Sequence, residues 1–303
     1  MAFTAFSAQT SAAEPAAKRR SPIALFLLLP GILYLILFFV TPLISLVITS
    51  FQEPDPVRFG SFVNAFRWEN YVIVLETYGE QSLRSAGFAA LATLFALLIG
   101  FPLGYFIGIT LRPYPLLQGL ALVLVIAPFF ISFLLRTLAW KQIFSDEGPL
   151  AGVLSALAIL PPGQAITGTA FSVIFGLPYC VVPFMTLPIY ATLASLDLRL
   201  LEAGNDLYGS PAVTFRTVTL PLSAAGVMSG TLLTFIPAAG DYINASREFL
   251  GSTDTTMIGN VIETNFLVLQ NFPAAAALSL VLMAAILILV SLYVRRSGTE
   301  ELL

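Results

Sequence analysis

Six long runs of apolar residues are the feature that most constrains how this chain can fold. They cover residues 23–48, 86–111, 116–135, 171–190, 224–239 and 274–294. A helix needs about 20 predominantly apolar residues to cross the hydrocarbon core of a bilayer. Only 10% of the residues are charged, whereas a soluble domain typically contains about 25%. The sequence therefore predicts an all-α integral membrane protein with six spans in a lipid bilayer.

The two ends of the chain are predicted to be tails outside the membrane domain. Residues 1–22 are rich in Ala, Ser and Thr and include Lys18, Arg19 and Arg20, which predicts a disordered cytoplasmic segment. The apolar run that follows is longer than the roughly 7–15 residues of a signal-peptide core, so we expect an uncleaved first span. Basic residues next to the spans, including Arg295 and Arg296, favour cytoplasmic termini. We expect one membrane domain at 23–296 and a second tail at 297–303.

The residue types limit the chemistry of the chain. It contains no histidine, the commonest general base and metal ligand. Its single cysteine, Cys180, lies in an apolar run, which excludes an intrachain disulfide and a cysteine-based metal cluster. Neither lysine belongs to a GK[ST] motif, so no phosphate-binding loop for ATP is present. We expect no catalytic site, no metal site and no bound cofactor, and the net charge of -3 gives no indication of nucleic-acid binding.

A polar stretch at residues 196–221 separates the fourth and fifth apolar runs. Leu196, Leu200, Ala203 and Leu207 recur at helical spacing, which predicts an amphipathic helix. The residues left more exposed would be Asp197, Arg199, Asn205 and Asp206. We expect Ser195 to cap this helix, Gly209 to end it, and Ser210-Pro211 to begin a second one. The pattern alone fits a helix lying on lipid headgroups as well as one that binds a protein.

The same stretch resembles the EAA loop of ABC-importer permeases. Glu202-Ala203 is followed eighteen residues later by Leu220-Pro221, as in that loop. In that family the loop forms a cytoplasmic coupling helix that docks in a groove of the ATPase subunit. The resemblance implies that the coupling residues are Glu202, Ala203, Gly204, Asp206, Tyr208, Gly209, Leu220 and Pro221. Two positions depart from the pattern, because Gly204 replaces the second alanine and Tyr208 replaces the glycine, which follows one residue late.

Further blocks resemble spermidine/putrescine permeases of the PotB type, over residues 68–294. They are PFFISFLLRTLAW (128–140), FIPAAGDYI (235–243) and NFPAAAALSL (271–280). This resemblance implies the six-span transmembrane domain of a type I ABC importer in the bacterial inner membrane, with polyamines as cargo. Ferric iron, thiamine and phosphonates remain alternative cargos. The partners implied are a second homologous permease chain, two ATPase subunits that carry ATP and Mg, and an extracytoplasmic substrate-binding protein.

The end of the fifth run contains the candidate residues of a translocation path, namely Phe235, Pro237, Asp241 and Tyr242. A carboxylate at Asp241 would attract an ammonium group, and the Tyr242 ring could add a cation-π contact of about 0.5–2 kcal/mol. The competing hypothesis is that Asp241 caps the helix end or pairs with Arg247.

Two other function classes fit the sequence less well. Gly240-Asp241 matches half of an aspartyl intramembrane-protease motif, but Ala238 departs from it and no Tyr-Asp partner occurs. A secondary transporter usually carries ionisable residues in mid-span. The six apolar runs contain no Asp, Glu, Lys or Arg in their cores. An ATP-driven importer therefore fits better than either class.

Overall fold

The computed structural model describes residues 22–55, 58, 60–159, 161, 164–208 and 210–296. The chain divides into two units, Met1–Leu46 and Val47–Leu303. In the first unit, α1 (Pro22–Leu35) continues through the π-helical turn η1 (Ile36–Val40) into α2 (Thr41–Ser50), which runs across the boundary. The predicted tails at 1–22 and 297–303 lie outside the described residues except for Pro22, and the predicted domain bounds stay a prediction.

The second unit begins with a short hairpin and is otherwise helical. Strands β1 (Gln52–Pro54) and β2 (Phe62–Asn64) are antiparallel, with Glu53 opposite Val63. The helical elements that follow are α3 (Glu69–Tyr105), η2 (Phe106–Thr110), α4 (Pro115–Ile126), η3 (Ala127–Phe130), α5 (Phe133–Phe144), α6 (Pro149–Ala156), α7 (Ala170–Ala194), α8 (Leu198–Tyr208), α9 (Pro211–Thr214), η4 (Phe215–Thr219), α10 (Leu220–Leu222), α11 (Ala224–Ala239), η5 (Thr253–Thr255), α12 (Ile258–Glu263), η6 (Thr264–Val268) and α13 (Phe272–Arg296).

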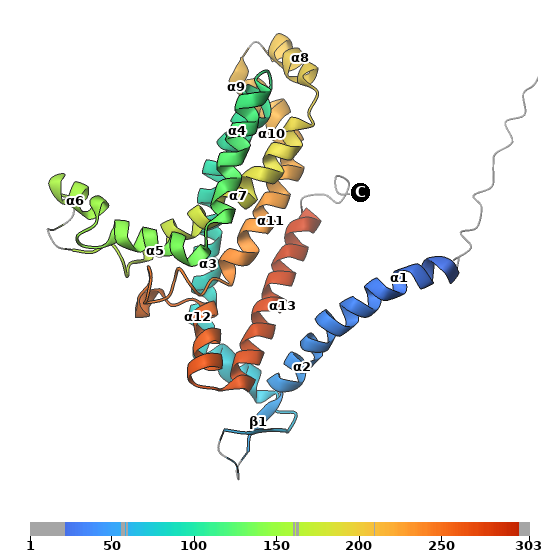
Figure 1. Cartoon of the computed structure of the whole chain (residues 1–303), viewed down its shortest axis with the longest axis vertical. Coiled ribbons are helices and arrows are strands. Elements are labelled where there is room, and N and C mark those ends of the chain that lie inside the picture. The colour runs from blue at the N-terminus through green and yellow to red at the C-terminus, as the bar shows by residue number, and fades with distance from the viewer. Residues whose placement is uncertain are drawn as a thin grey trace, which may run out of the picture. The chain divides into compact units, whose positions relative to one another are not determined.

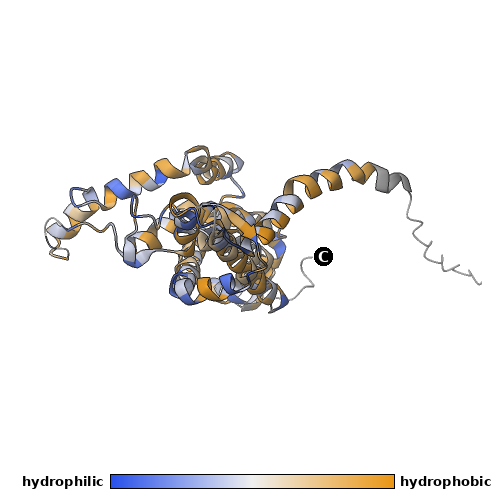
Figure 2. Cartoon of the chain, turned by 90° about the horizontal axis from the view of Figure 1, so that it is seen from below, coloured by the Kyte–Doolittle hydropathy of each residue, from blue (hydrophilic) through white to orange (hydrophobic). Residues whose placement is uncertain are grey.

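Among the described residues, four helices are long and apolar enough to cross a membrane, and two bent pairs raise the possible number of spans to 6. Hydrophobic residues dominate these helices (Figure 2). The all-α membrane class is confirmed. The third predicted span, 116–135, is wrong as a single helix, because the chain bends by 94° between the segment Pro115–Phe130 and the segment Phe133–Ala156, which contains α5 and α6. Ile131 there has an extended backbone, just after Pro128, whose ring removes a backbone donor and disfavours a continuous helix.

Helix α7 packs closely between α3 and α11. A Cβ atom on Gly100 of α3 would lie 2.9 Å from Met185 Cγ, and one on Gly104 would lie 2.9 Å from Ile189 Cγ2. On α11, a Cβ on Gly230 would lie 2.9 Å from Met185 Sδ. Small residues let helix backbones approach closely in lipid, where van der Waals packing drives association. Around these three closely packed helices, α8 and α9 lie at one end of the bundle and α12 lies towards the other (Figure 1).

Candidate functional site

The polar stretch at 196–221 forms helices, but its first helix begins later than predicted. Asp197 Oδ1 accepts a hydrogen bond of 3.0 Å from the Arg199 backbone N–H, which satisfies a donor in the first turn of α8. The Ser195 hydroxyl instead donates to the Thr192 carbonyl at 2.8 Å. Ser195 has helical backbone angles at the end of α7. The prediction that Ser195 caps the helix is therefore wrong, and Asp197 has that role.

The apolar face of α8 is uncovered, which corrects the predicted orientation. Leu196 is buried, but Leu200 is 48% exposed, Leu207 is 79% exposed and Ala203 is also exposed. Among residues 198–207 of α8, whose burial the structure describes, Gly204 is the buried one. Apolar periodicity shows that a helix has an apolar side, but it does not show which side packs within the same chain. None of the residues that the structure describes covers that side here.

Gly204 is the point where α8 meets the following helical segment. A Cβ atom there would lie 2.8 Å from Thr214 Cγ2 and 3.1 Å from Val218 Cγ2. This close packing explains why a glycine stands in place of the second alanine of the EAA pattern. The second helix begins as predicted, because Ser210 has an extended backbone and Pro211 takes the first helical position, although the Ser210 side chain makes no capping hydrogen bond.

Several predicted coupling residues share the uncovered surface, which we call the α8 surface and define as Leu200, Glu202, Ala203, Asp206 and Leu207. All five are exposed. Glu202 also borders a hollow of about 280 Å³ whose other walls include Tyr105, Asn205 and Phe215. Leu220 and Pro221 are exposed as well, at the start of α10. Gly209 and the side chain of Tyr208 lie outside the described residues.

One hydrogen bond and two ring contacts connect this loop to the rest of the helical bundle. Arg112 Nη1 donates to the Leu196 carbonyl at 2.7 Å, just before α8 begins. The Phe215 ring in η4 meets Phe101 edge-on at 5.6 Å and Tyr105 at 5.9 Å, measured between ring centroids. Movement of α8 would therefore be passed to α3.

Asp241 is the second predicted site and lies just beyond the end of α11. It is 8% exposed. Its carboxylate accepts from Asn244 Nδ2 at 3.0 Å and from the Ala245 backbone N–H at 3.2 Å. Burial raises the pKa of Asp241 to about 6, and these hydrogen bonds offset only part of that effect. Asp241 therefore organises the turn that follows it, and exposed Arg247 forms no ion pair with any residue that the structure describes.

The other predicted path residues lie close to Asp241 in sequence but differ in exposure. Tyr242 is 47% exposed, and its carbonyl accepts from Asn260 Nδ2 at 2.5 Å. Phe235 packs against a buried apolar cluster that includes Leu177, whereas Pro237 is exposed. Asp241 and Tyr242 are thus neighbours with opposite exposure. Their role in a path stays a prediction.

Sequence reasoning missed the residues that hold Asp241 in place. Thr137 Oγ1 on α5 donates to Asn244 Oδ1 at 3.1 Å, so a chain of hydrogen bonds runs from α5 through Asn244 to Asp241. The spacing of Asp241 and Asn244 resembles a local turn and could have been found. The contact between Thr137 and Asn244 joins residues that are far apart in the chain, so no pattern in the neighbouring sequence could have predicted it.

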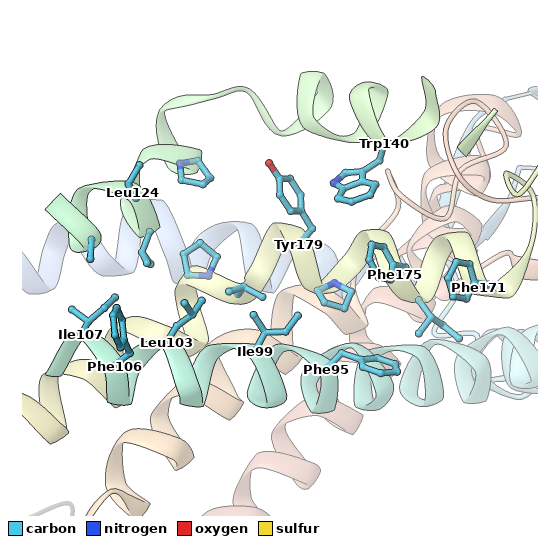
Figure 3. A pocket seen from close by; sticks show the side chains of 17 residues that line it. Phe95, Ile99, Leu103, Phe106, Ile107, Leu124, Trp140, Phe171, Phe175 and Tyr179 are labelled. Carbon is cyan, nitrogen blue, oxygen red and sulfur yellow. The ribbon is translucent and has the colours of Figure 1, made fainter. Parts of the chain in front are cut away.

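An apolar cavity of about 650 Å³ lies between α3, α4, α5 and α7 (Figure 3). No charged side chain lines it; its walls are Phe95, Ile99, Leu103, Phe106, Ile107, Ala121, Leu124, Val125, Pro128, Trp140, Phe171, Ile174, Phe175, Pro178, Tyr179, Val182 and Pro183. A cation there would meet aromatic faces and the Tyr179 hydroxyl but no carboxylate among these residues.

Similarity to curated proteins decides the family. No family model matches the chain. The spermidine/putrescine transport system permease protein PotB of Haemophilus influenzae is 33% identical over 263 residues, which are 86% of this chain and 90% of that protein. PotB of Escherichia coli K12 is 34% identical over 265 residues, or 87% of this chain and 94% of that protein. The chain belongs to the PotB permease family.

Solved structures agree with this PotB family assignment at the level of the fold. A bacterial ABC transporter involved in the import of alginate matches 92% of this chain and 96% of its own, with a TM-score of 0.66 and 17% identity. The MetNI methionine ABC transporter, in an inward-facing form, matches 72% of this chain and 91% of its own, with a TM-score of 0.50 and 17% identity. The PotB-family chain therefore has the fold of an ABC-importer transmembrane domain, as predicted.

Proposed function

We propose that the chain is the membrane-spanning permease subunit of an ATP-driven importer of spermidine- and putrescine-type polyamines. The observation that carries this proposal is the 33–34% identity, over nearly the whole chain, to PotB proteins whose names give those two cargos. These names favour polyamines over ferric iron, thiamine or phosphonates. The chain itself is not an enzyme, and ATP and Mg are bound by the separate ATPase.

The importer contains three further kinds of subunit in this proposal. They are a second related permease chain, two ATPase subunits and an extracytoplasmic substrate-binding protein. The absence of a GK[ST] motif from the full sequence supports a separate ATPase. The complex lies in the bacterial inner membrane with both termini of this chain in the cytoplasm. This topology also places α8 in the cytoplasm.

The α8 surface is where the ATPase docks. Leu200 and Leu207 offer uncovered apolar area, and the exposed carboxylates of Glu202 and Asp206 flank it. A helix with this pattern suits a hydrophobic groove with a basic rim. Burying apolar surface contributes about 25 cal/mol per Å², while the carboxylates contribute orientation more than affinity.

Closure of the ATPase subunits would move α8 against the bundle. The Phe215 ring contacts carry that movement to α3, and the Arg112–Leu196 hydrogen bond carries it to the turn that follows η2. Glycines of α3 lie in direct contact with side chains of α7. A displacement of α3 therefore displaces α7 as well. The bundle thereby alternates between outward- and inward-facing states.

Asp241 is the cargo contact in this proposal. The carboxylate accepts hydrogen bonds from Asn244 and Ala245, and the ammonium group would bind at the small part of Asp241 that stays exposed. The exposed Tyr242 ring offers a second, weaker attraction for a cation at the same turn.

Reconstitution tests the proposal directly. The complete complex in proteoliposomes, with the binding protein outside and ATP inside, should accumulate labelled spermidine and putrescine. The matched control uses an ATPase that binds ATP without hydrolysing it, and uptake should then stop. Uptake that continues in this control would indicate a secondary transporter. A complex that hydrolyses ATP but moves no polyamine would contradict the cargo.

A further inference from the structure

The apolar cavity between α3, α4, α5 and α7 is open to the surroundings of the chain. Of the residues that line it, Leu124 is 66% exposed, Phe171 56% and Ile99 48%. The helices that carry these residues are long and apolar enough to cross a membrane, α4 as part of a bent pair. The surroundings of the opening are therefore lipid or another transmembrane helix. The polar side-chain atoms of the lining are limited to the Tyr179 hydroxyl and the Trp140 indole nitrogen.

The cavity is long and narrow. Helices α3 and α7 run in the same direction, because Gly100 meets Met185 and, one turn further, Gly104 meets Ile189. In this register Ile107, at one end of the cavity, lies about 30 Å from the start of α7, at the other end (Figure 3). This length is similar to the thickness of a hydrocarbon core, which is about 30 Å. A volume of about 650 Å³ over that length corresponds to a channel about 5 Å wide.

The width of the channel limits what can occupy it. A helix with its side chains is about 10–12 Å across, so a transmembrane helix of another subunit is too wide to enter. Carbon atoms in contact lie about 3.5–4.0 Å apart, so a channel of this width accepts a single hydrocarbon chain. Water does not fill apolar cavities, and an empty channel would leave its walls without contacts. A hydrocarbon chain is therefore the occupant that fits the width and the chemistry of the walls.

A polyamine cargo fits the cavity less well than hydrocarbon does. Its ammonium groups would meet aromatic faces, but no carboxylate lines the cavity, and Asp241 is not among the lining residues. A hydrocarbon chain needs no counter-charge and contacts the apolar walls along its whole length.

We propose that acyl chains of membrane phospholipids occupy this cavity and lie along α3 and α7. They enter through the opening at Leu124 and separate α4 from the closely packed pair of α3 and α7. Because an acyl chain is flexible, it keeps contact with the walls when α3 and α7 shift relative to α4. The inference concerns the membrane domain alone and does not depend on the cargo.

Quenching of Trp140 fluorescence by brominated lipids tests the inference. The complete importer is reconstituted with phospholipids that carry bromine atoms on the acyl chain, which quench tryptophan on contact. The signal of Trp140 is the difference between each importer and its Trp140→Phe derivative. Brominated lipid should lower this signal at least twofold relative to unbrominated lipid, while iodide in the water should leave it unchanged.

A matched pair of substitutions on α4 separates the cavity from the outer surface. Val125 lines the cavity, whereas Val123 is not among the lining residues and is 61% exposed. Val125→Phe should fill part of the channel and remove most of the quenching. Val123→Phe adds the same volume outside the cavity and should leave the quenching unchanged. Ala121→Phe fills the channel one turn away on α4 and gives an independent variant, and the amount of each variant in the membrane shows that it has folded.

Four results would overturn the inference. Equal quenching in Val125→Phe, Ala121→Phe and the unmodified importer would show that lipid reaches Trp140 from outside the cavity. Quenching by iodide would show that the cavity holds water, and a signal that neither quencher lowers would show that another protein chain covers it. Loss of the lipid quenching when spermidine is added would assign the cavity to the cargo. The measurement needs no transport, so an importer that moves no polyamine would contradict the proposed function and leave this test valid.

Discussion

Gly204 and Thr214 approach so closely that a Cβ atom on the glycine would lie 2.8 Å from Thr214 Cγ2. This contact joins α8 to α9 and leaves the apolar side of α8 uncovered. The position of the α8 surface therefore depends on a residue without a side chain.

Enlarging Gly204 should uncouple the importer. In Gly204→Val the added atoms would collide with Thr214 and Val218, and overpacking of this kind costs typically about 1–3 kcal/mol. We expect ATP-driven uptake to fall about tenfold while the amount of protein in the membrane is unchanged. Gly119→Val, at an exposed glycine of α4 where an added Cβ atom would meet nothing within 4 Å, is the matched control for added volume. Equal uptake by the two variants would show that the Gly204 contact does not matter for coupling.

Charge reversal at Glu202 should weaken docking of the ATPase. Glu202→Lys places a cation where the proposed ATPase groove has a basic rim, and like charges across an interface reduce association. We expect about a five- to tenfold loss of co-purified ATPase and of uptake, with normal membrane insertion. Glu147→Lys makes the same charge change at an exposed residue of the loop before α6 and should leave both quantities unaltered. Normal ATPase recovery with Glu202→Lys would rule out this contact.

Thiol labelling tests the proposed topology. In a Cys180→Ala background, Ser210→Cys should resist an impermeant thiol reagent in intact cells, because the loop is cytoplasmic. Ser252→Cys should react, because the segment after α11 lies on the other side. Permeabilised cells should label both positions, which controls for burial of either thiol. Labelling of Ser210→Cys in intact cells would contradict both the topology and the coupling role of α8.

The charge of Asp241 should control polyamine uptake in a pH-dependent way. Its pKa is raised to about 6, so at pH 7.5 the group is almost wholly ionised, whereas at pH 5.5 only about one quarter is. Since the carboxylate attracts the cargo only when ionised, the concentration for half-maximal uptake should increase as the external pH falls through 6. Asp241→Asn should show the higher value at every pH, with basal ATP hydrolysis retained. The same pH curve in Asp241→Asn and in the unmodified chain would make Asp241 a structural residue.

The sequence by itself determined the membrane class, the family and the helix–break–helix form of the loop at 196–221. These properties are local. The length of an apolar run decides whether a helix can span lipid, and Ser210-Pro211 restarts a helix wherever the chain places it.

Only the tertiary structure decided which side of α8 packs, where the third span bends and what holds Asp241. The apolar spacing of Leu200 and Leu207 suggested a protected face, yet the close contact of Gly204 with Thr214 turns that face outward. The 94° bend before α5 brings Thr137 to Asn244, and Asn244 to Asp241. Such contacts join residues distant in sequence, so their energies depend on how helices pack together and leave no periodic pattern in the chain.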